Sequence, residues 1–178
     1  MENKPKKLSK KNKTDRWKDV ERGVAHYLSR KFAELELNPV ERIPVLGREG
    51  PDVGVNQSKL AVDVKSRQEV PKIMWHHHGA VRWGITEPLV AVRLCEFEKL
   101  FGETKAVAII PPKTVREYME HMASWSEEHI PAIILHRPRI RIANAIFVIR
   151  EADIERLRNN IPKFLMEEKW HDAEMLQK

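Results

Sequence analysis

The chain has 178 residues, of which 42% are hydrophobic and 33% charged, and its formal net charge is +6 at pH 7. This is the composition of a globular protein with a charged surface, which argues against an intrinsically disordered chain. The length suits one domain that buries its own core, and no run of 18 apolar residues is present to span a membrane.

The cysteine usage and the N-terminal sequence favour an intracellular location. Cys95 is the single cysteine, so the chain cannot form an internal disulfide. It follows the apolar run from Leu89 to Leu94 and is expected to be a small core residue. The charged N-terminus is not followed by the apolar segment of a secretory signal. We therefore expect a cytoplasmic protein, or a phage protein that acts in the cytoplasm of its host.

The basic excess lies in the first 18 residues. They hold seven lysines and Arg16 against Glu2 and Asp15, a net charge of +6, and the rest of the chain is neutral. Residues 1–14 are polar and lysine-rich, which predicts a flexible basic tail ahead of a single domain at 15–178. Such a tail binds polyanions without reading sequence, and it can equally serve solubility alone.

The hydrophobic pattern predicts a regular order of helices and strands. Helical spacing predicts a first helix that begins at Thr14 or Asp15 and ends before Asn38-Pro39, with Glu21 at the head of an apolar stripe. The later elements are strands at 40–46, 52–55 and 60–66, a helical turn at 73–78, a strand at 89–94, a helical turn at 96–101, a strand at 106–110, a helix at 114–128, strands at 132–136 and 145–149, and a helix from residue 152. This order predicts an α/β fold with layers around a mixed sheet.

Two aspartates are expected to oppose each other in the hairpin of the strands at 52–55 and 60–66. If Val55 pairs with Leu60, then Asp52 lies opposite Asp63, with Cβ atoms roughly 4.5–5.5 Å apart. Two carboxylates at this separation repel, so one must take a proton or a cation must bind between them. Oxygen ligands of this kind suit magnesium, and manganese can substitute.

Lys65 and Glu21 extend this pair of carboxylates. Lys65 lies two residues beyond Asp63 on the same face of the strand, where an ammonium group can hold water or a phosphate oxygen. Glu21 becomes a third carboxylate if its helix packs against the hairpin. Each feature alone is typical of a solvated strand face, and together they favour a catalytic site.

The run from Pro51-Asp52 to Asp63-Val64-Lys65 resembles the signature of the PD-(D/E)xK nuclease superfamily. The segment 17–67 is most similar to archaeal-type and phage Holliday junction resolvases, with Glu21 as the helical acidic residue and Lys65-Ser66-Arg67 as the basic end of the motif. The resemblance implies a restriction-endonuclease-like fold, a central mixed β-sheet flanked by helices. Residues 68–128 exceed what the compact members need and are interpreted as an insertion or an elaborated middle segment.

The resemblance also implies an activity. It implies a homodimer that cuts phosphodiester bonds in branched DNA with magnesium, resolving four-way (Holliday) junctions by paired symmetric nicks. Glu21, Asp52 and Asp63 would bind the metal, together with the backbone carbonyl of Val64. Lys65 would position the attacking water and offset charge in the transition state. No nucleotide cofactor and no membrane is implied.

Basic residues outside the motif are candidate DNA contacts. Arg137, Arg139 and Arg141 alternate with apolar residues, which on a strand would place three guanidinium groups on one side, beside His136. A solvated hairpin is the alternative. The other candidate contacts are Lys10, Lys11, Lys13 and Arg16 near the N-terminus, and Arg42, Arg48 and Arg67 around the proposed site.

Two further features favour structural interpretations. His76, His77 and His78 have no partner Cys or His pair at zinc-ligand spacing, so a surface cluster is expected. Trp75, Trp83 and Trp125 are expected in the core or a dimer interface rather than as stacking platforms for bases.

Three alternatives to a junction resolvase remain. One is another PD-(D/E)xK DNA nuclease, either restriction-like or recombination-associated. The second is a non-catalytic DNA-binding module that keeps the fold. The third is a protein-interaction domain whose basic tail is incidental, which predicts no DNA binding at low salt.

Overall fold

The computed structural model describes residues 11–33, 40–42, 51–55, 59–66, 71–107, 109–124 and 128–160, with side chains for the same ranges apart from 11–17, 32–33, 40–42, 55, 66 and 73. The helices are α1 (Lys11–Ala33), α2 (Lys72–His76), α3 (Lys113–Ala123) and α4 (Ile154–Asn160), with 3₁₀ helices η1 (Leu94–Phe101), η2 (Ile142–Asn144) and η3 (Glu151–Asp153). The strands are β1 (Val40–Arg42), β2 (Val53–Val55), β3 (Leu60–Ser66), β4 (Ala80–Trp83), β5 (Leu89–Arg93), β6 (Thr104–Val107), β7 (Ile130–His136) and β8 (Ile146–Arg150).

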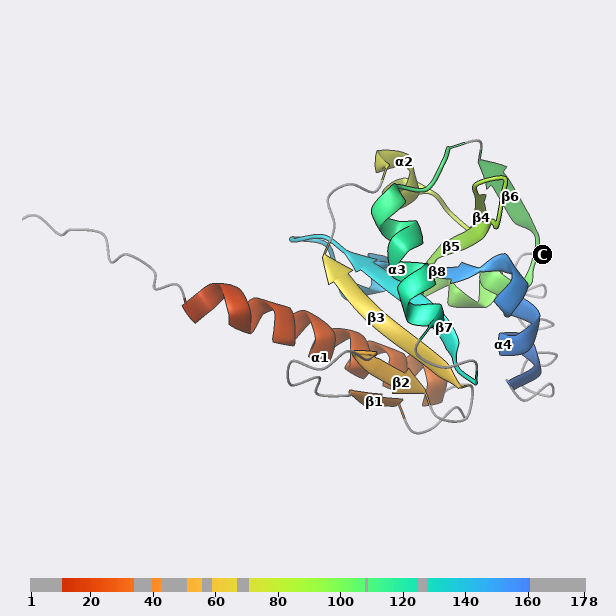
Figure 1. Ribbon diagram of the computed structural model, residues 1–178. Helices are drawn as coiled ribbons and strands as arrows, with labels where there is room; N and C mark the ends of the chain where they lie inside the picture. The colour runs from red at the N-terminus through yellow and green to blue at the C-terminus, as the bar shows by residue number, and fades with distance from the viewer. Residues whose placement is uncertain are drawn as a thin grey trace, which may run out of the picture.

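The strands form one mixed sheet with the order β1-β2-β3-β7-β8-β5-β4-β6 (Figure 1). Neighbours are antiparallel except for two parallel pairs, β3 with β7 and β4 with β6. The prediction of an α/β fold around a mixed sheet is therefore confirmed. The predicted hairpin register is confirmed as well, since Val53 pairs with Val62 and Val55 with Leu60.

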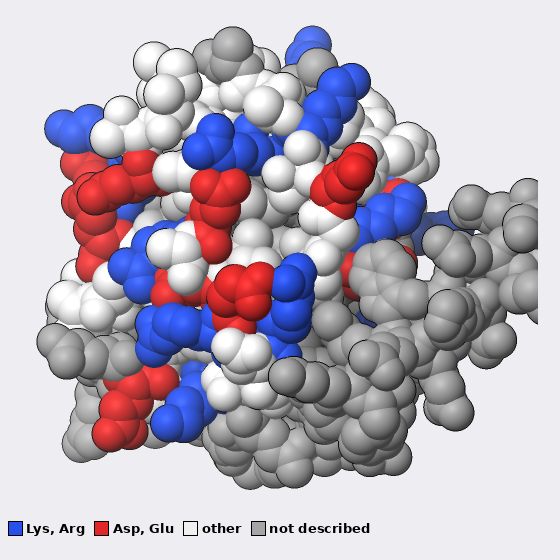
Figure 2. Space-filling view, turned by 90° about the vertical axis from the view of Figure 1, so that its right-hand side faces the viewer, with Lys and Arg blue, Asp and Glu red and all other residues white. Residues whose placement is uncertain are grey.

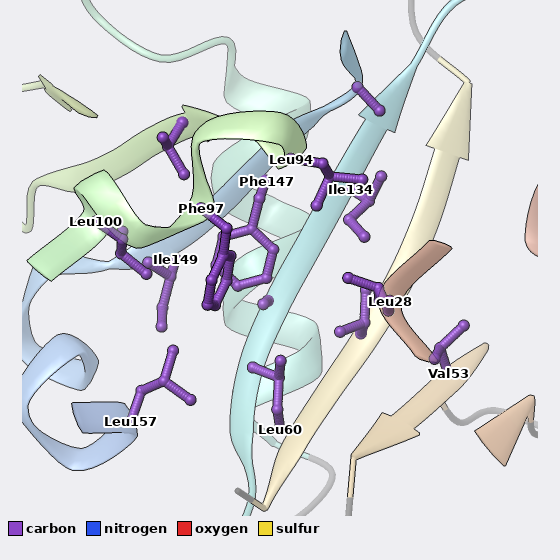
Figure 3. Close-up of a cluster of buried hydrophobic side chains, with 14 of the residues drawn as sticks. Leu28, Val53, Leu60, Leu94, Phe97, Leu100, Ile134, Phe147, Ile149 and Leu157 are labelled. Carbon is purple, nitrogen blue, oxygen red and sulfur yellow. The ribbon is translucent and has the colours of Figure 1, made fainter. Parts of the chain in front are cut away.

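Helices cover both faces of this sheet. Alternation along each strand sends neighbouring side chains to opposite faces, so Val62 and Val64 pack in one core with Val24 and Leu28 of α1. That core also takes side chains from η1 and α4, as Figure 3 shows around Phe97, Phe147 and Leu157. Ile133 and Leu135 face the other way and pack in a second core with α3.

The first helix begins earlier than the sequence pattern predicted. We expected its start at Thr14 or Asp15, whereas α1 begins at Lys11, inside the predicted flexible tail. Lysine is a good helix former and no Gly or Pro interrupts residues 11–14, so the helix continues backwards at little cost. Residues 1–10 and the predicted helix stop at Asn38-Pro39 lie outside the described residues.

The middle segment is part of the sheet. Its strands β4 and β5, followed by β6, extend the sheet beyond β8, so residues 68–128 contribute to the domain core. The pattern missed β4, because a four-residue strand next to three histidines gives little alternation to detect. It placed β6 two residues too late at its N-terminal end, and α3 ends at Ala123 rather than Glu128.

Prolines cap the helices of the middle segment. Pro71 and Pro112 lie at the N-cap positions of α2 and α3, with extended ψ angles of 137° and 141°. Each proline therefore lies immediately before the first residue of its helix. None of the helices in the described part of the chain combines the length and apolar character that crossing a membrane requires.

Candidate active site

The β2–β3 hairpin places two aspartates side by side. The pairing of Val53 with Val62 puts the preceding Asp52 opposite Asp63 when the register continues by one residue. Asp63 points to the sheet face covered by α3 and is 5% exposed. A buried aspartate on a core strand is uncommon unless it is paired, so this position is marked out by its environment as well as by its sequence motif.

Each aspartate has a defined partner. The backbone N–H of Val64 donates a hydrogen bond of 2.7 Å to Oδ2 of Asp52. The Lys65 ammonium lies 2.8 Å from Oδ2 of Asp63, and the Lys65 side chain is about one-third exposed. The predicted cluster of Asp52, Asp63 and Lys65 is therefore brought together by one hairpin.

The pKa of the Asp52 carboxyl group is raised to about 7. Burial makes the largest contribution, and a hydrogen bond with the Asp63 carboxyl group raises the pKa further. The Val64 N–H opposes the shift, while the negative charges of Asp63 and Glu21 add to it. The site consequently holds more negative charge than its one ammonium group balances, which is the condition that a cation or a proton relieves.

Glu21 approaches the pair from α1, which packs against β1 and β3. It is half-buried, and its charge contributes to the raised pKa of Asp52. In the described part of the chain, however, no three Asp, Glu, His or Cys side chains already stand in a geometry that could hold a metal ion. The two hairpin aspartates thus form the close pair, and Glu21 is a neighbouring carboxylate.

The donor chemistry of this site suits a hard divalent cation. Carboxylate oxygens are the ligands that Mg²⁺ and Mn²⁺ prefer. Val64 can add its backbone carbonyl, because the N–H and C=O of one strand residue point to the same side and its N–H already points to Asp52. The raised pKa of Asp52 is the observation that favours a cation here, since a positive charge would let both carboxylates ionise.

Tyr118 is a site residue that the sequence pattern did not identify. The Lys65 ammonium lies 5.1 Å from the centre of the Tyr118 ring, within the range of a cation–π contact. Tyr118 lies on α3, where it flanks the buried Val115, Met119 and Met122. Its proximity to Lys65 depends on how α3 crosses the sheet, which periodicity alone does not specify.

The arginine-rich connection between the predicted strands is not itself a strand, so its three guanidinium groups are not aligned on one strand face. Residues 137–141 form a turn between β7 and η2, and Arg139 adopts a positive φ of 72°. Pro138 prevents a regular strand because it has no N–H to donate. Arg139 and Arg141 are exposed, while the guanidinium of Arg137 lies 5.2 Å from the ring of Trp75 on α2.

His136 does not face solvent as a phosphate contact would. It is buried, and its Nε2–H donates to the carbonyl of Ile140 at 3.1 Å. Burial lowers the pKa of the imidazole, which the hydrogen bond to Ile140 partly offsets. The residue therefore braces the turn that carries Arg139 and Arg141.

The remaining predicted DNA contacts are only partly located. Lys11, Lys13 and Arg16 lie on α1, and Arg42 ends β1, but their side chains are outside the described set. Lys10, Arg48 and Arg67 lie outside the described residues altogether, as does Trp125. Their roles stay predictions.

His78 of the histidine cluster contacts η1, and Cys95 lies within η1. His76 and His78 are exposed, and Nδ1 of His78 lies 3.3 Å from Oε1 of Glu96 and in contact with Arg93. The surface cluster predicted for these histidines agrees with this position. Cys95 is half-buried, with Sγ 3.9 Å from Oδ1 of Asn144, so the prediction of a core position was wrong.

Paired charges cover the side of the molecule on which α4 lies. Asp153 accepts from Arg150 and Arg156, and Glu151 accepts from Arg82. In Figure 2 basic and acidic side chains accordingly alternate on this side. A polyanion would meet no uniformly positive surface there.

A pocket of about 500 Å³ lies apart from the aspartates, between α3 and the ends of β5 and β8. Its lining is Glu87, Pro88, Leu89, Arg116, Met119, Glu120, Arg150, Glu151 and Ala152. Arg150 and Glu151 are already engaged in ion pairs. We place the chemistry at the hairpin, because the perturbed carboxyl group and its ammonium partner are there and not in this pocket.

Comparison of the chain with protein-family models, with curated proteins and with solved structures gives no match.

Proposed function

We propose that this protein is a magnesium-dependent endodeoxyribonuclease of the PD-(D/E)xK type. The observation that carries the proposal is the hairpin pair Asp52 and Asp63, with Lys65 bound to Asp63 at 2.8 Å and the pKa of Asp52 raised to about 7. Paired carboxylates beside an ammonium group supply what metal-assisted phosphodiester hydrolysis requires. The sequence motif and this geometry favour the same residues, and they favour the same role for each.

The reaction would be in-line attack of water on the phosphorus of a phosphodiester. The new P–O bond forms to the water oxygen, the P–O bond to the leaving sugar oxygen breaks, and that oxygen takes up a proton. Mg²⁺, when bound, supplies Lewis-acid activation of the phosphate and lowers the pKa of water. Asp52, Asp63, Glu21 and the Val64 carbonyl would hold the ion. Lys65 would orient the attacking water and offset the charge that develops on phosphate oxygens.

The topology is consistent with the restriction-endonuclease-like fold that the sequence resemblance implied. The antiparallel strands β1, β2 and β3 follow α1, and β3 then pairs in parallel with β7. The face of β7 that carries Ile133 and Leu135 is covered by α3. Asp63 lies on β3 and Asp52 immediately precedes β2, with α1 and α3 on opposite sides of the sheet (Figure 1). This arrangement leaves the end of β3 that carries Lys65 close to the arginine-rich turn, since Ser66 pairs with His136.

Branched DNA is the substrate that we propose, and the four-way junction is the favoured form. A homodimer would place two such sites on one junction and cut two strands symmetrically. Support comes from the resemblance in segment 17–67 and from the basic turn at 137–141, which lies beside the end of β3 that carries Lys65. The exposed Arg139 and Arg141 offer contacts to phosphates at one end.

A substrate panel tests this function. Labelled four-way junction, duplex and single-stranded DNA would be incubated with Mg²⁺ and the unsubstituted protein or the Asp63→Ala variant. Paired symmetric nicks in the junction alone, absent in the variant, are expected. Cleavage of duplex or single strands at the same rate would leave a nuclease of another specificity. Tight DNA binding without cleavage in Mg²⁺ or Mn²⁺ would leave a non-catalytic binding module and refute the proposal.

A further inference from the structure

Lys65 contacts both Asp63 and Tyr118, and Asp63 is the ligand that a metal would engage. Its ammonium lies 2.8 Å from Oδ2 of Asp63 and 5.1 Å from the centre of the Tyr118 ring. An ammonium paired with a carboxylate is held by charge. If that carboxylate binds a divalent cation, its negative charge is shared, and the attraction on Lys65 weakens.

The aromatic contact does not compete with metal binding. A ring face attracts an ammonium through its quadrupole, and it has no lone pair that a hard cation would prefer over carboxylate oxygen. Tyr118 lies on α3, on the flank of the buried stripe formed by Val115, Met119 and Met122. Packing of that stripe against β7 fixes the height of α3 above the sheet, so the ring is held over Lys65 by the core itself.

We propose that Tyr118 is a positioning residue for Lys65, and that its ring keeps the Lys65 ammonium at the scissile phosphate when Asp63 is occupied by metal. This inference rests on the proposed nuclease function. It also assigns a role in the site to the middle segment, whose helix α3 supplies the ring. The hydroxyl group of Tyr118 is not needed for this role.

Three variants on α3 separate the ring from other effects. Tyr118→Leu removes the ring, Tyr118→Phe keeps it without the hydroxyl group, and Glu117→Ala is a control on the exposed side of the same helix. Steady-state cleavage of four-way junction DNA in Mg²⁺, with the junction in excess over the protein, would be measured for each. We expect Tyr118→Leu to lower kcat roughly tenfold with KM changed less than twofold, which lies within the range of a half-buried cation–π contact. Tyr118→Phe and Glu117→Ala should retain the unsubstituted rate.

A readout without DNA tests the contact itself. The methylene protons next to the Lys65 ammonium should be shifted upfield by the ring current in the unsubstituted protein and in Tyr118→Phe, and not in Tyr118→Leu. Equal kcat values for Tyr118→Leu and the unsubstituted protein would overturn the positioning role while leaving the nuclease in place. Loss of activity in Tyr118→Phe as large as in Tyr118→Leu would assign the effect to the hydroxyl group and overturn it too. If the unsubstituted protein cleaves no DNA, the proposed function fails, and this inference fails with it whatever the ring-current shift.

Discussion

At the scale of single residues, Asp52 is held at an energetic disadvantage in the protein without metal. Its pKa is raised from 3.8 to about 7 by burial and by the neighbouring carboxyl groups of Asp63 and Glu21. A carboxyl group in this state keeps a proton that the unfolded chain would release. Binding sites commonly hold such groups, because the ligand removes the conflict that the fold creates.

This conflict predicts how Asp52→Asn changes stability. The folded state binds more protons than the unfolded state between pH 3.8 and about 7, so Asp52 lowers the stability of the fold progressively across this window. The penalty is absent below the window and complete above it. Without divalent ions, the Asp52→Asn variant should therefore be more stable than the unsubstituted protein at pH 8. After allowance for the partial exposure of Asp52, we expect its free energy of unfolding to be higher by on the order of 1–2 kcal/mol.

Urea denaturation at pH 4 and at pH 8, in the presence of a chelator, measures this difference. The asparagine keeps an oxygen to accept from the Val64 N–H, so the hairpin bond is retained. Equal stabilities of variant and unsubstituted protein at pH 8 would contradict the strained aspartate pair.

The roles of Asp63 and Lys65 give a separate prediction for catalysis. Because both side chains would act on the reacting phosphate rather than on DNA binding, Asp63→Ala and Lys65→Ala should each lower kcat by at least about a hundredfold. Junction binding, measured by fluorescence anisotropy in Ca²⁺, should change less than fivefold. Parallel loss of binding and of the folded state would mean that these residues maintain structure instead.

At the scale of elements, η1 is fastened by a buried carboxylate. Glu96 accepts hydrogen bonds from Lys99, Arg93 and the backbone N–H of Gly79, which ties η1 to β5 and to the start of β4. Burial alone would raise the pKa of Glu96, but the bonds from Lys99 and Arg93 outweigh burial and lower it to about 2. The network serves the fold, and no part of the proposed reaction depends on it.

Glu96→Gln should accordingly weaken the protein at neutral pH. A carboxylate with a lowered pKa stabilises the fold above its unfolded pKa of 4.5, and this contribution is lost as the pH falls towards 2. The free energy of unfolding of the variant should be lower by about 2 kcal/mol at pH 7. This is less than the full pKa shift of Glu96 corresponds to, because Lys99 is half-exposed. Thermal unfolding between pH 2 and pH 7 tests this, with the exposed Glu98→Gln as control. A stability difference between Glu96→Gln and the unsubstituted protein that stays constant with pH would contradict a stabilising role of the Glu96 charge.

The elements also show how far periodicity reaches. The β2–β3 hairpin was predicted correctly, with Val53 and Val55 facing Val62 and Leu60. Its apolar pattern allows one register, because a slip by one residue would bury the polar face of the strand. Arg and Ile also alternate at 137–141, which on a strand would align the arginine side chains, but Pro138 and the positive φ of Arg139 make this segment a turn. Alternation is a local signal, whereas a turn is decided by backbone conformation.

At the scale of the whole molecule, the paired charges of α4 and η3 leave the basic turn as the described region best suited to a polyanion. No acidic residue occurs between His129 and Arg150, and Arg139 and Arg141 are exposed. The Arg137–Trp75 contact joins this turn to α2, so the two segments present one surface.

Salt dependence of DNA binding tests that surface. Each phosphate contact that is lost should reduce the slope of log K against log salt by about 1, so Arg139→Ala with Arg141→Ala should reduce it by about 2. Lys105→Ala, on the exposed edge strand β6, removes a charge far along the sheet and should leave the slope unchanged. An equal effect of all three substitutions would indicate general charge and no defined contact surface.

The layered architecture could be predicted from the sequence. The positions of the site residues outside the hairpin could not, because they depend on how the helices pack on the sheet. Asp52, Asp63 and Lys65 share one hairpin, so strand spacing alone brought them together. Tyr118 lies more than 50 positions away on α3, and its place over Lys65 follows from the parallel pairing of β3 with β7 and the packing of α3 on that pair. The distance of Glu21 from the aspartates likewise depends on the crossing of α1, which no short pattern encodes.

The most direct test of the central claim is the rate of junction cleavage as Mg²⁺ is titrated, measured for the unsubstituted protein and for Asp63→Asn. The account predicts no cleavage in chelator, a rate that rises to saturation with Mg²⁺, and a flat, near-zero response for Asp63→Asn although it folds and binds the junction. Cleavage that persists without divalent ions, or an Asp63→Asn variant that responds to Mg²⁺ as the unsubstituted protein does, would contradict a metal-dependent site at Asp52 and Asp63.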